Sequence, residues 1–236
     1  MFALANPLKA VDYFLRAEPA GLGAWLTRQG SRLVWFCLIG VVAGAGLYGA
    51  VMGCWRAPLQ ALYVAIKLPL LILLTTLGNG LLNGMLAPLL GMNITFRQSL
   101  TAVLVSFAFA AVVLAGLSPV ALFVVWNTPS LSASTWLQSP EYGFLQLTHV
   151  VFIAFAGIVG NLRLLPLLEK MAGNAFVARK VLLAWLAGNL FLGSQLCWVL
   201  RPFIWDPAGS VEFIGRQYFH GSFYETVFEA LKRLLF

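Results

Sequence analysis

Five long apolar runs, separated by short segments that hold most of the charged residues, constrain the fold more than any other feature. Each run is close to or above the roughly 20 residues that a helix needs to cross the hydrocarbon core of a bilayer. A backbone surrounded by lipid must satisfy its own hydrogen bonds, so spans of this kind form helices. The sequence therefore predicts an all-α integral membrane bundle of five transmembrane spans, at residues 33–54, 59–82, 100–126, 144–162 and 181–200.

The composition agrees with a bilayer location. Of 236 residues, 61% are hydrophobic and 10% are charged, and the mean hydropathy is +0.88, whereas soluble domains carry about 25% charged residues. We expect one membrane domain at 33–204, an N-terminal interfacial segment at 1–32, and a C-terminal loop and helix at 205–236. The net charge of +7 lies beside the spans, which favours anionic lipid as a partner and not nucleic acid.

Amphipathic interfacial helices are expected at both ends of the chain. Near the N-terminus, Asn6-Pro7 is a helix start signal, and apolar residues recur at helical spacing over residues 8–15. Near the C-terminus, apolar residues between 223 and 234 form one helical face opposite a charged face. Helices of this kind lie in the interface of a membrane.

Basic residues predict the orientation of the bundle. Four of them precede the first span and four lie in the segment 163–180, whereas the loop 127–143 has none. Cytoplasmic loops carry the excess of Lys and Arg. We therefore expect a multi-pass protein of a cell inner (cytoplasmic) membrane, with a cytoplasmic N-terminus and, after five crossings, a C-terminus outside.

Two of the spans contain expected breaks. Gly78-Asn79-Gly80 ends the regular helical pattern of the second span, and the apolar segment 81–90 that follows is too short to cross. We expect this segment to be interfacial or re-entrant. Gly116-Leu117-Ser118-Pro119 is expected to break the third span, which is too long for one straight crossing.

Small residues mark surfaces where helices can approach closely. In the first span, glycines recur at a spacing of four, and the fourth span carries a similar pair. Such spacing favours close helix packing in membranes. The candidate packing residues are Gly40, Gly44, Gly49, Gly53, Ala156 and Gly160.

Lys67 is the most unusual residue, because it places a cation inside an apolar span, two residues before Pro69. A cation there costs roughly 2.5–3.5 kcal/mol on insertion scales, and the span interiors hold no acidic partner. In one interpretation its long stem reaches the headgroups or carbonyls freed by Pro69. In the other, it forms an anion or lipid-headgroup site lined by Lys67, Thr75 and Asn79, or closed by Arg201.

The sequence contains no recognisable catalytic set. No HExxH, GxSxG or Walker pattern occurs, and there are only two histidines. We therefore expect a protein that is not an enzyme, with no metal and no cofactor. His149, near the outer end of the fourth span, is open to two interpretations: a packed polar residue, or a ligand of a metal or a chlorin-type pigment.

Three segments carry a resemblance to known families. KLPLL at 67–71, GSQLCWVLRPFI at 193–204 and FYETV at 223–227 resemble recurring blocks of an uncharacterised family of bacterial polytopic membrane proteins, over the five spans and the tail. The span layout, with a lysine-proline pair in the second span, is also similar to the Yip family, five-span proteins of the secretory pathway that bind small GTPases and membrane-shaping partners. That resemblance implies a cytoplasmic N-terminus, an outside C-terminus and a non-enzymatic role.

The expected function is that of a scaffold or accessory subunit within a membrane complex. The small-residue faces supply packing surfaces for another membrane protein or for self-association. The first alternative is a small anion or lipid transporter or channel that uses the Lys67 region. The second alternative is an accessory protein that binds a pigment or cofactor at His149.

Overall fold

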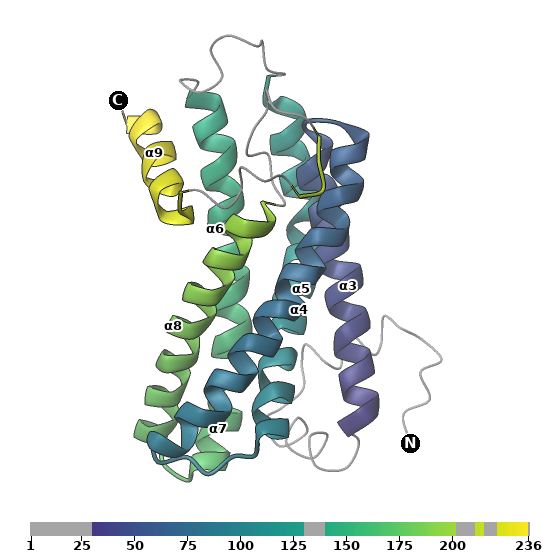
Figure 1. Ribbon diagram of the computed structural model, residues 1–236. Helices are drawn as coiled ribbons and strands as arrows, with labels where there is room; N and C mark the ends of the chain where they lie inside the picture. Colours follow the sequence, from purple (N-terminus) through teal and green to yellow (C-terminus); the bar gives the residue numbers. More distant parts are fainter. Residues whose placement is uncertain (1–29, 130–139, 202–210, 215–220, 236) are drawn as a thin grey trace.

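The computed structural model describes residues 30–129, 140–201, 211–214 and 221–235, and helices make up most of this part of the chain (Figure 1). No strand occurs among these residues, so the predicted all-α class is confirmed. Five helices are long and apolar enough to cross a membrane, which makes this a multi-pass membrane protein. The helices are α3 (Gly30–Cys54), α4 (Pro58–Leu89), α5 (Phe96–Asn127), α6 (Pro140–Leu162), α7 (Leu165–Ala172), α8 (Ala175–Leu200) and α9 (Phe223–Leu235).

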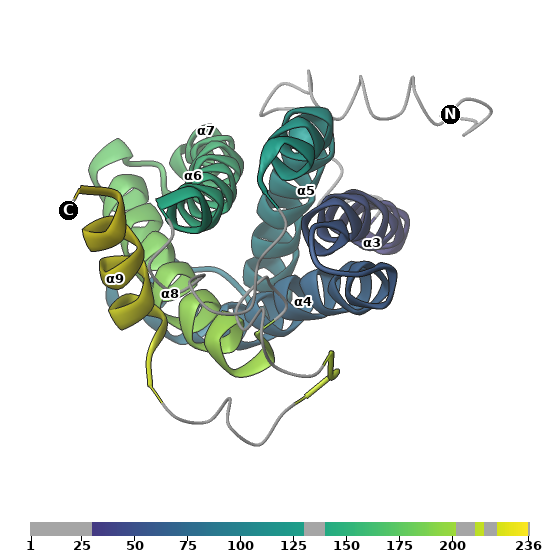
Figure 2. The same cartoon turned by 90° about the horizontal axis from the view of Figure 1, so that it is seen from above.

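The long helices form two groups that meet at the middle of the bundle (Figures 1 and 2). Helices α3, α4 and α5 pack against one another, α8 packs on α4, and α6 packs on α5. Helices α6 and α8 have little direct contact, and α9 lies against both of them. The first residues of α3 and the helix α9 lie towards opposite ends of the bundle (Figure 1). Helices α6 and α8 are therefore only loosely packed against each other.

Local signals in the sequence account for several helix ends. Helix α5 begins with a capping box, in which Thr95 and Gln98 exchange side-chain and backbone hydrogen bonds. Helix α8 begins after Asn174, whose side chain accepts from two backbone N–H groups. Helix α7 is capped by Gly173, whose φ of 64° is a left-handed conformation that glycine adopts without strain. Gly173 and Asn174 together form the short turn between α7 and α8.

The predicted break in the second span is wrong, because α4 continues as one helix from Pro58 to Leu89. Gly80 lets Leu100 of α5 approach, since an added Cβ would lie 2.7 Å from that side chain. Asn79 donates its side-chain N–H to α8. These contacts to neighbouring helices stabilise a stretch whose local propensity is poor. The segment 81–90 is therefore neither re-entrant nor a separate interfacial helix.

The predicted break in the third span is wrong as well. Helix α5 runs without interruption from Phe96 to Asn127 and includes Pro119. Proline removes one backbone donor from a helix, and Pro119 itself lies on an exposed side. Ser118 donates its hydroxyl to the carbonyl of Leu114 one turn earlier. One lost hydrogen bond is a small penalty in a helix whose other face is packed along most of its length.

Of the two predicted amphipathic helices, the N-terminal one lies outside the described residues. The C-terminal one is present as α9. Thr226 and Ala230 are its buried residues, and they face the bundle rather than open solvent or lipid. Tyr224 of α9 and Ser194 of α8 are joined by a hydrogen bond of 2.9 Å between their hydroxyl groups. The helix α9 is therefore part of the wall of the bundle.

Most of the candidate packing residues lie where two helices approach each other. A Cβ added at Gly44 would lie 2.5 Å from the carbonyl oxygen of Ala111 in α5, and one at Gly53 would lie 2.6 Å from the Cα of Ala61 in α4. Gly49 meets Val64 in the same way. In α6, Gly160 lies against the backbone of α5 and Ala156 is fully buried. Gly40 has nothing within 4 Å of an added Cβ, so it takes no part in such a contact.

Candidate functional site

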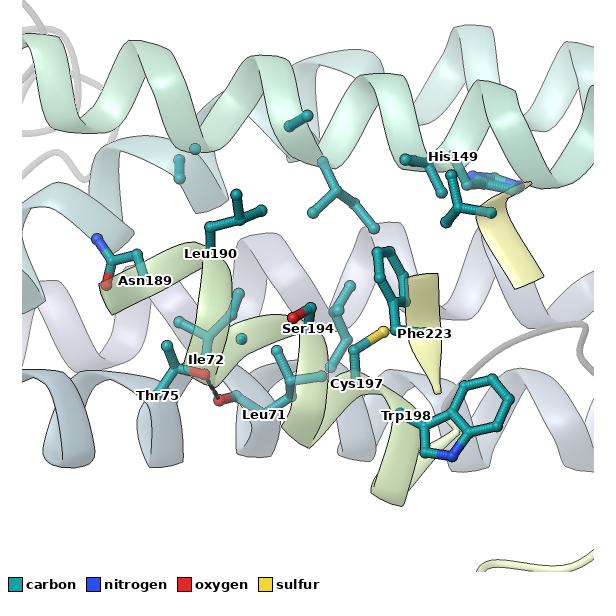
Figure 3. Close-up of a pocket in the computed structure, with 18 of the residues that line it drawn as sticks. Leu71, Ile72, Thr75, His149, Asn189, Leu190, Ser194, Cys197, Trp198 and Phe223 are labelled. Carbon is teal, nitrogen blue, oxygen red and sulfur yellow. Dashed lines mark hydrogen bonds between the residues drawn. The ribbon is translucent and has the colours of Figure 1, made fainter. Parts of the chain in front are cut away.

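A cavity of about 470 Å³ lies between α4, α5, α6, α8 and α9 (Figure 3). Ligand pockets in proteins span roughly 300–1,000 Å³ and are mostly apolar. The side chains that surround this cavity are almost all apolar, and they come from both groups of helices. Representative lining residues are Leu71, Ile72, Leu114, Ile153, Leu186 and Val227. The cavity has the size and the chemistry of a site for a hydrophobic molecule.

The cavity opens sideways between α6 and α8. Leu190 of α8 and Ile158 of α6 both line it, yet they are 64% and 50% exposed. Their neighbours on the outer faces of the same helices, Phe155 and Phe191, are also exposed and apolar. In a membrane protein this surface contacts the lipid tails. A molecule could thus enter from the hydrocarbon without crossing a polar layer.

His149 lies at one end of this cavity, opposite Asn189 at the other end (Figure 3). The residue is 4% exposed, and its Nδ1 is 2.8 Å from the hydroxyl of Tyr48 in α3. The two rings also meet edge to face, with centroids 5.7 Å apart. Its other nitrogen, Nε2, has no hydrogen-bond partner among the described residues. The imidazole is therefore fixed on one edge and unsatisfied on the other.

Helix α9 closes the same end of the cavity. Phe223, Thr226, Val227 and Ala230 of α9 line it. Arg201, which ends α8, also lines it, and its guanidinium carbon lies 4.0 Å from the centre of the Trp198 ring. The end near His149 is thus bounded by polar groups as well as by an apolar helix face.

A ladder of three asparagines borders the opposite end. Asn79 of α4 donates its side-chain N–H to the side-chain oxygen of Asn189 of α8. Asn189 donates in turn to the side-chain oxygen of Asn161 in α6, at 3.1 Å. Asn161 donates to the carbonyl of Gly157, at 2.8 Å. The ladder joins three helices that are distant in sequence and holds α6 and α8 at the spacing that leaves the cavity between them.

Replacing Asn189 by leucine should therefore lower the stability of the bundle by more than the change in side-chain volume predicts. The substitution leaves Asn79 and Asn161 without their shared partner inside an apolar environment. Hydrogen bonds between membrane helices contribute about 0.6–2 kcal/mol each, so we expect a loss of about 1–2 kcal/mol in the free energy of unfolding, measured by denaturation in detergent. Asn127→Leu, at an exposed asparagine that bonds only within its own helix among the described residues, is the control. Equal stability of the two variants would show that the ladder contributes nothing.

Lys67 does not lie in this cavity. Its side chain is fully buried, and its Nζ has no hydrogen-bond partner among the described residues. The Nζ lies 4.8 Å from the centre of the Phe213 ring, which is a cation–π contact. The Phe213 ring also packs edge to face on Tyr63, one turn before Lys67 in α4.

The four predicted site residues are only partly brought together. Thr75 and Arg201 line the cavity, whereas Lys67 and Asn79 do not. Thr75 donates its hydroxyl within its own helix, to the carbonyl of Leu71. Lys67 and Asn79 are separated by 12 residues of one helix, which is about 18 Å at 1.5 Å per residue. A single site made from Lys67, Thr75 and Asn79 is therefore not formed in this structure.

Several residues of the site were not singled out from the sequence. Asn161 and Asn189 are polar residues inside apolar runs, and this signal was available. Tyr48 and Gln146 were not identifiable, because their roles depend on which helices become neighbours. Among the described residues, no group of three or more His, Cys, Asp or Glu side chains could hold a metal ion.

Comparison with known proteins gives no match: no family model, no curated protein and no solved structure matches this chain.

Proposed function

We propose that this is a non-enzymatic integral membrane protein that binds one lipid or lipid-like molecule inside its helical bundle. The observation that carries the proposal is the apolar cavity of about 470 Å³ with its opening between Leu190 and Ile158. An empty apolar space of this size would forfeit many van der Waals contacts. A lipid tail restores these contacts and enters from the surrounding hydrocarbon. The lipid ligand is the one expected for the lipid transporter or channel described above, but it lies in the cavity and not at Lys67.

The scaffold or accessory-subunit role is the second candidate, and the exposed surface bears on it. Gly44, Gly49, Gly53 and Gly160 are used in contacts within the bundle, so they offer no face to another protein. Gly40 remains open. A partner would have to recognise the large exposed side chains of the outer surface instead. Lipid binding needs no such partner, and for this reason we place it first.

The proposal keeps the orientation inferred from the basic residues. With the N-terminus in the cytoplasm of a cell with an inner membrane, the ladder Asn79–Asn189–Asn161 lies nearer the cytoplasmic face. The His149 end then lies nearer the opposite face. The ligand would enter sideways from the leaflet that borders Leu190 and Ile158.

Filling the cavity tests the proposal directly. Gly157 lines it, and an added Cβ there meets no atom within 4 Å, so a large side chain can enter the space without striking a backbone. We expect Gly157→Phe to remain folded and to lose most of the lipid that copurifies with the wild-type protein, measured by native mass spectrometry.

Gly116→Phe is the matched control, because Gly116 also has open space around its Cα, is exposed, and does not line the cavity. It should keep the copurified lipid. If the wild-type protein carries no bound lipid, or if both variants carry the same amount as the wild type, lipid binding in this cavity is refuted.

A further inference from the structure

His149 is a polar residue of the cavity wall, and its contact with Tyr48 determines which ring nitrogen carries the proton. The Tyr48 side chain is fully buried, and among the described residues its hydroxyl bonds to the Nδ1 of His149. The two nitrogens of an imidazole point in widely different directions, so Nε2 faces away from Tyr48. His149 itself lines the cavity. The unpartnered Nε2 thus belongs to a residue of the cavity wall, and the atom itself is almost fully buried.

The Tyr48 contact decides whether this nitrogen donates or accepts. If the Tyr48 hydroxyl donates to Nδ1, the neutral ring carries its proton on Nε2, and one donor stays unsatisfied. If Nδ1 donates instead, the phenol hydrogen and the Nε2 lone pair both lack a partner. Each buried unsatisfied group carries a desolvation penalty, so the first arrangement is favoured. A doubly protonated ring would also carry a proton on Nε2.

We propose that His149 Nε2–H donates a hydrogen bond to an oxygen at the polar end of a long-chain lipid, either a carbonyl or a phosphoryl oxygen. This inference rests on the lipid-binding function proposed above and names the chemistry of its ligand. The chain of that lipid extends along the cavity towards Leu190, and the polar end stays with His149. Gln146, one turn earlier on the same helix face, also lines the cavity, and its Oε1 has no partner among the described residues. Tyr48 acts as a positioning residue, because it holds the ring through Nδ1.

Three probes with chains of matched length separate the polar end from the chain: hexadecane, methyl palmitate and hexadecyl phosphate. They are titrated into the purified full-length protein in dodecyl maltoside. We expect methyl palmitate, hexadecyl phosphate or both to bind roughly tenfold more tightly than hexadecane, as one buried hydrogen bond predicts. Tighter binding of methyl palmitate alone would identify a carbonyl as the recognised group. Tighter binding of hexadecyl phosphate alone would identify a phosphoryl group.

In His149→Phe the preference for the oxygen-bearing probes should disappear, while hexadecane binds as before. Thr148→Val is the control, since Thr148 is the adjacent residue and donates within its own helix to Phe144. It should keep the preference.

A second measurement uses a protein in which His149 is intact, so its result does not depend on whether His149→Phe folds. The chain has two histidines, so His220→Gln leaves His149 as the single source of imidazole ¹⁵N signals. The Nε2–H signal should shift on addition of the preferred probe and stay unchanged with hexadecane.

Equal binding of all three probes to the wild-type protein, or an unchanged preference in His149→Phe, would overturn this inference. Lipid binding would still stand if Gly157→Phe blocks hexadecane. Failure of every probe to bind would reject the proposed function and this inference together.

Discussion

Replacing Gly49 by alanine should destabilise the bundle by about 2–3 kcal/mol, the upper part of the range of about 1–3 kcal/mol for overpacking a well-packed interior. The added Cβ would lie 2.6 Å from the carbonyl oxygen of Val64 and 3.0 Å from its carbonyl carbon. Both atoms belong to the backbone of α4, so they cannot move aside as a flexible side chain can. The helices α3 and α4 would have to separate along their contact. Thermal or denaturant unfolding in detergent micelles measures the loss.

Gly40→Ala is the control in the same helix with the same chemical change. An added Cβ there meets nothing within 4 Å, and alanine is the better helix former by up to about 1 kcal/mol. We therefore expect Gly40→Ala to be neutral or slightly stabilising. If the two variants unfold at the same point, close approach of α3 to α4 is not what Gly49 provides.

Replacing Lys67 by methionine should stabilise the protein by about 1–3 kcal/mol. Removing a cation from a membrane helix recovers about 2.5–3.5 kcal/mol, and losing its cation–π contact with Phe213 costs about 0.5–2 kcal/mol. Lys67 is fully buried and its Nζ has no hydrogen-bond partner among the described residues. Methionine has a similar length and no charge, and it keeps the apolar contacts of the stem. Unfolding in detergent should therefore shift to a higher temperature.

Lys180→Met provides a matched comparison. Lys180 also lies over an aromatic ring, with its Nζ 4.3 Å from the centre of Phe176, but both residues are exposed. A cation–π contact at an exposed site contributes about 0.5–1 kcal/mol, so this variant should change stability by no more than that. A loss of stability in Lys67→Met would mean that the contact of Nζ with the Phe213 ring, or with an anionic group, outweighs the burial penalty, and the prediction would be wrong.

The five apolar helices were predictable because lipid imposes one simple requirement on each of them. A span needs enough apolar residues to cross and an intact set of internal hydrogen bonds. The starts of α3, α4 and α5 lie within a few residues of the predicted ones. The predicted ends agree within one residue except that of α4, which continues to Leu89. The interruptions expected at Gly78–Gly80 and at Pro119 did not form, because packing against neighbours outweighs weak local propensity.

The candidate site could not be predicted in the same way. Lys67 was conspicuous by its charge, yet the cavity is defined by residues that look ordinary in the sequence, such as Leu190 and Gly157. Its polar end depends on the pairing of Tyr48 with His149, which are 101 positions apart. Which helices become neighbours is a property of the packed bundle, and no apolar run encodes it.

The length of α4 and α5 has a consequence for the membrane itself. Each helix has 32 residues, or about 48 Å at 1.5 Å per residue, whereas a typical hydrocarbon core is about 30 Å thick. To fit inside that core each helix would need a tilt of about 50°, beyond the usual range of up to about 40°. The surrounding bilayer must thicken to match the length of these helices, or the helix tips must project into the headgroup layer. Such hydrophobic mismatch favours thick membranes, and it contributes to the sorting of proteins between membranes of different thickness.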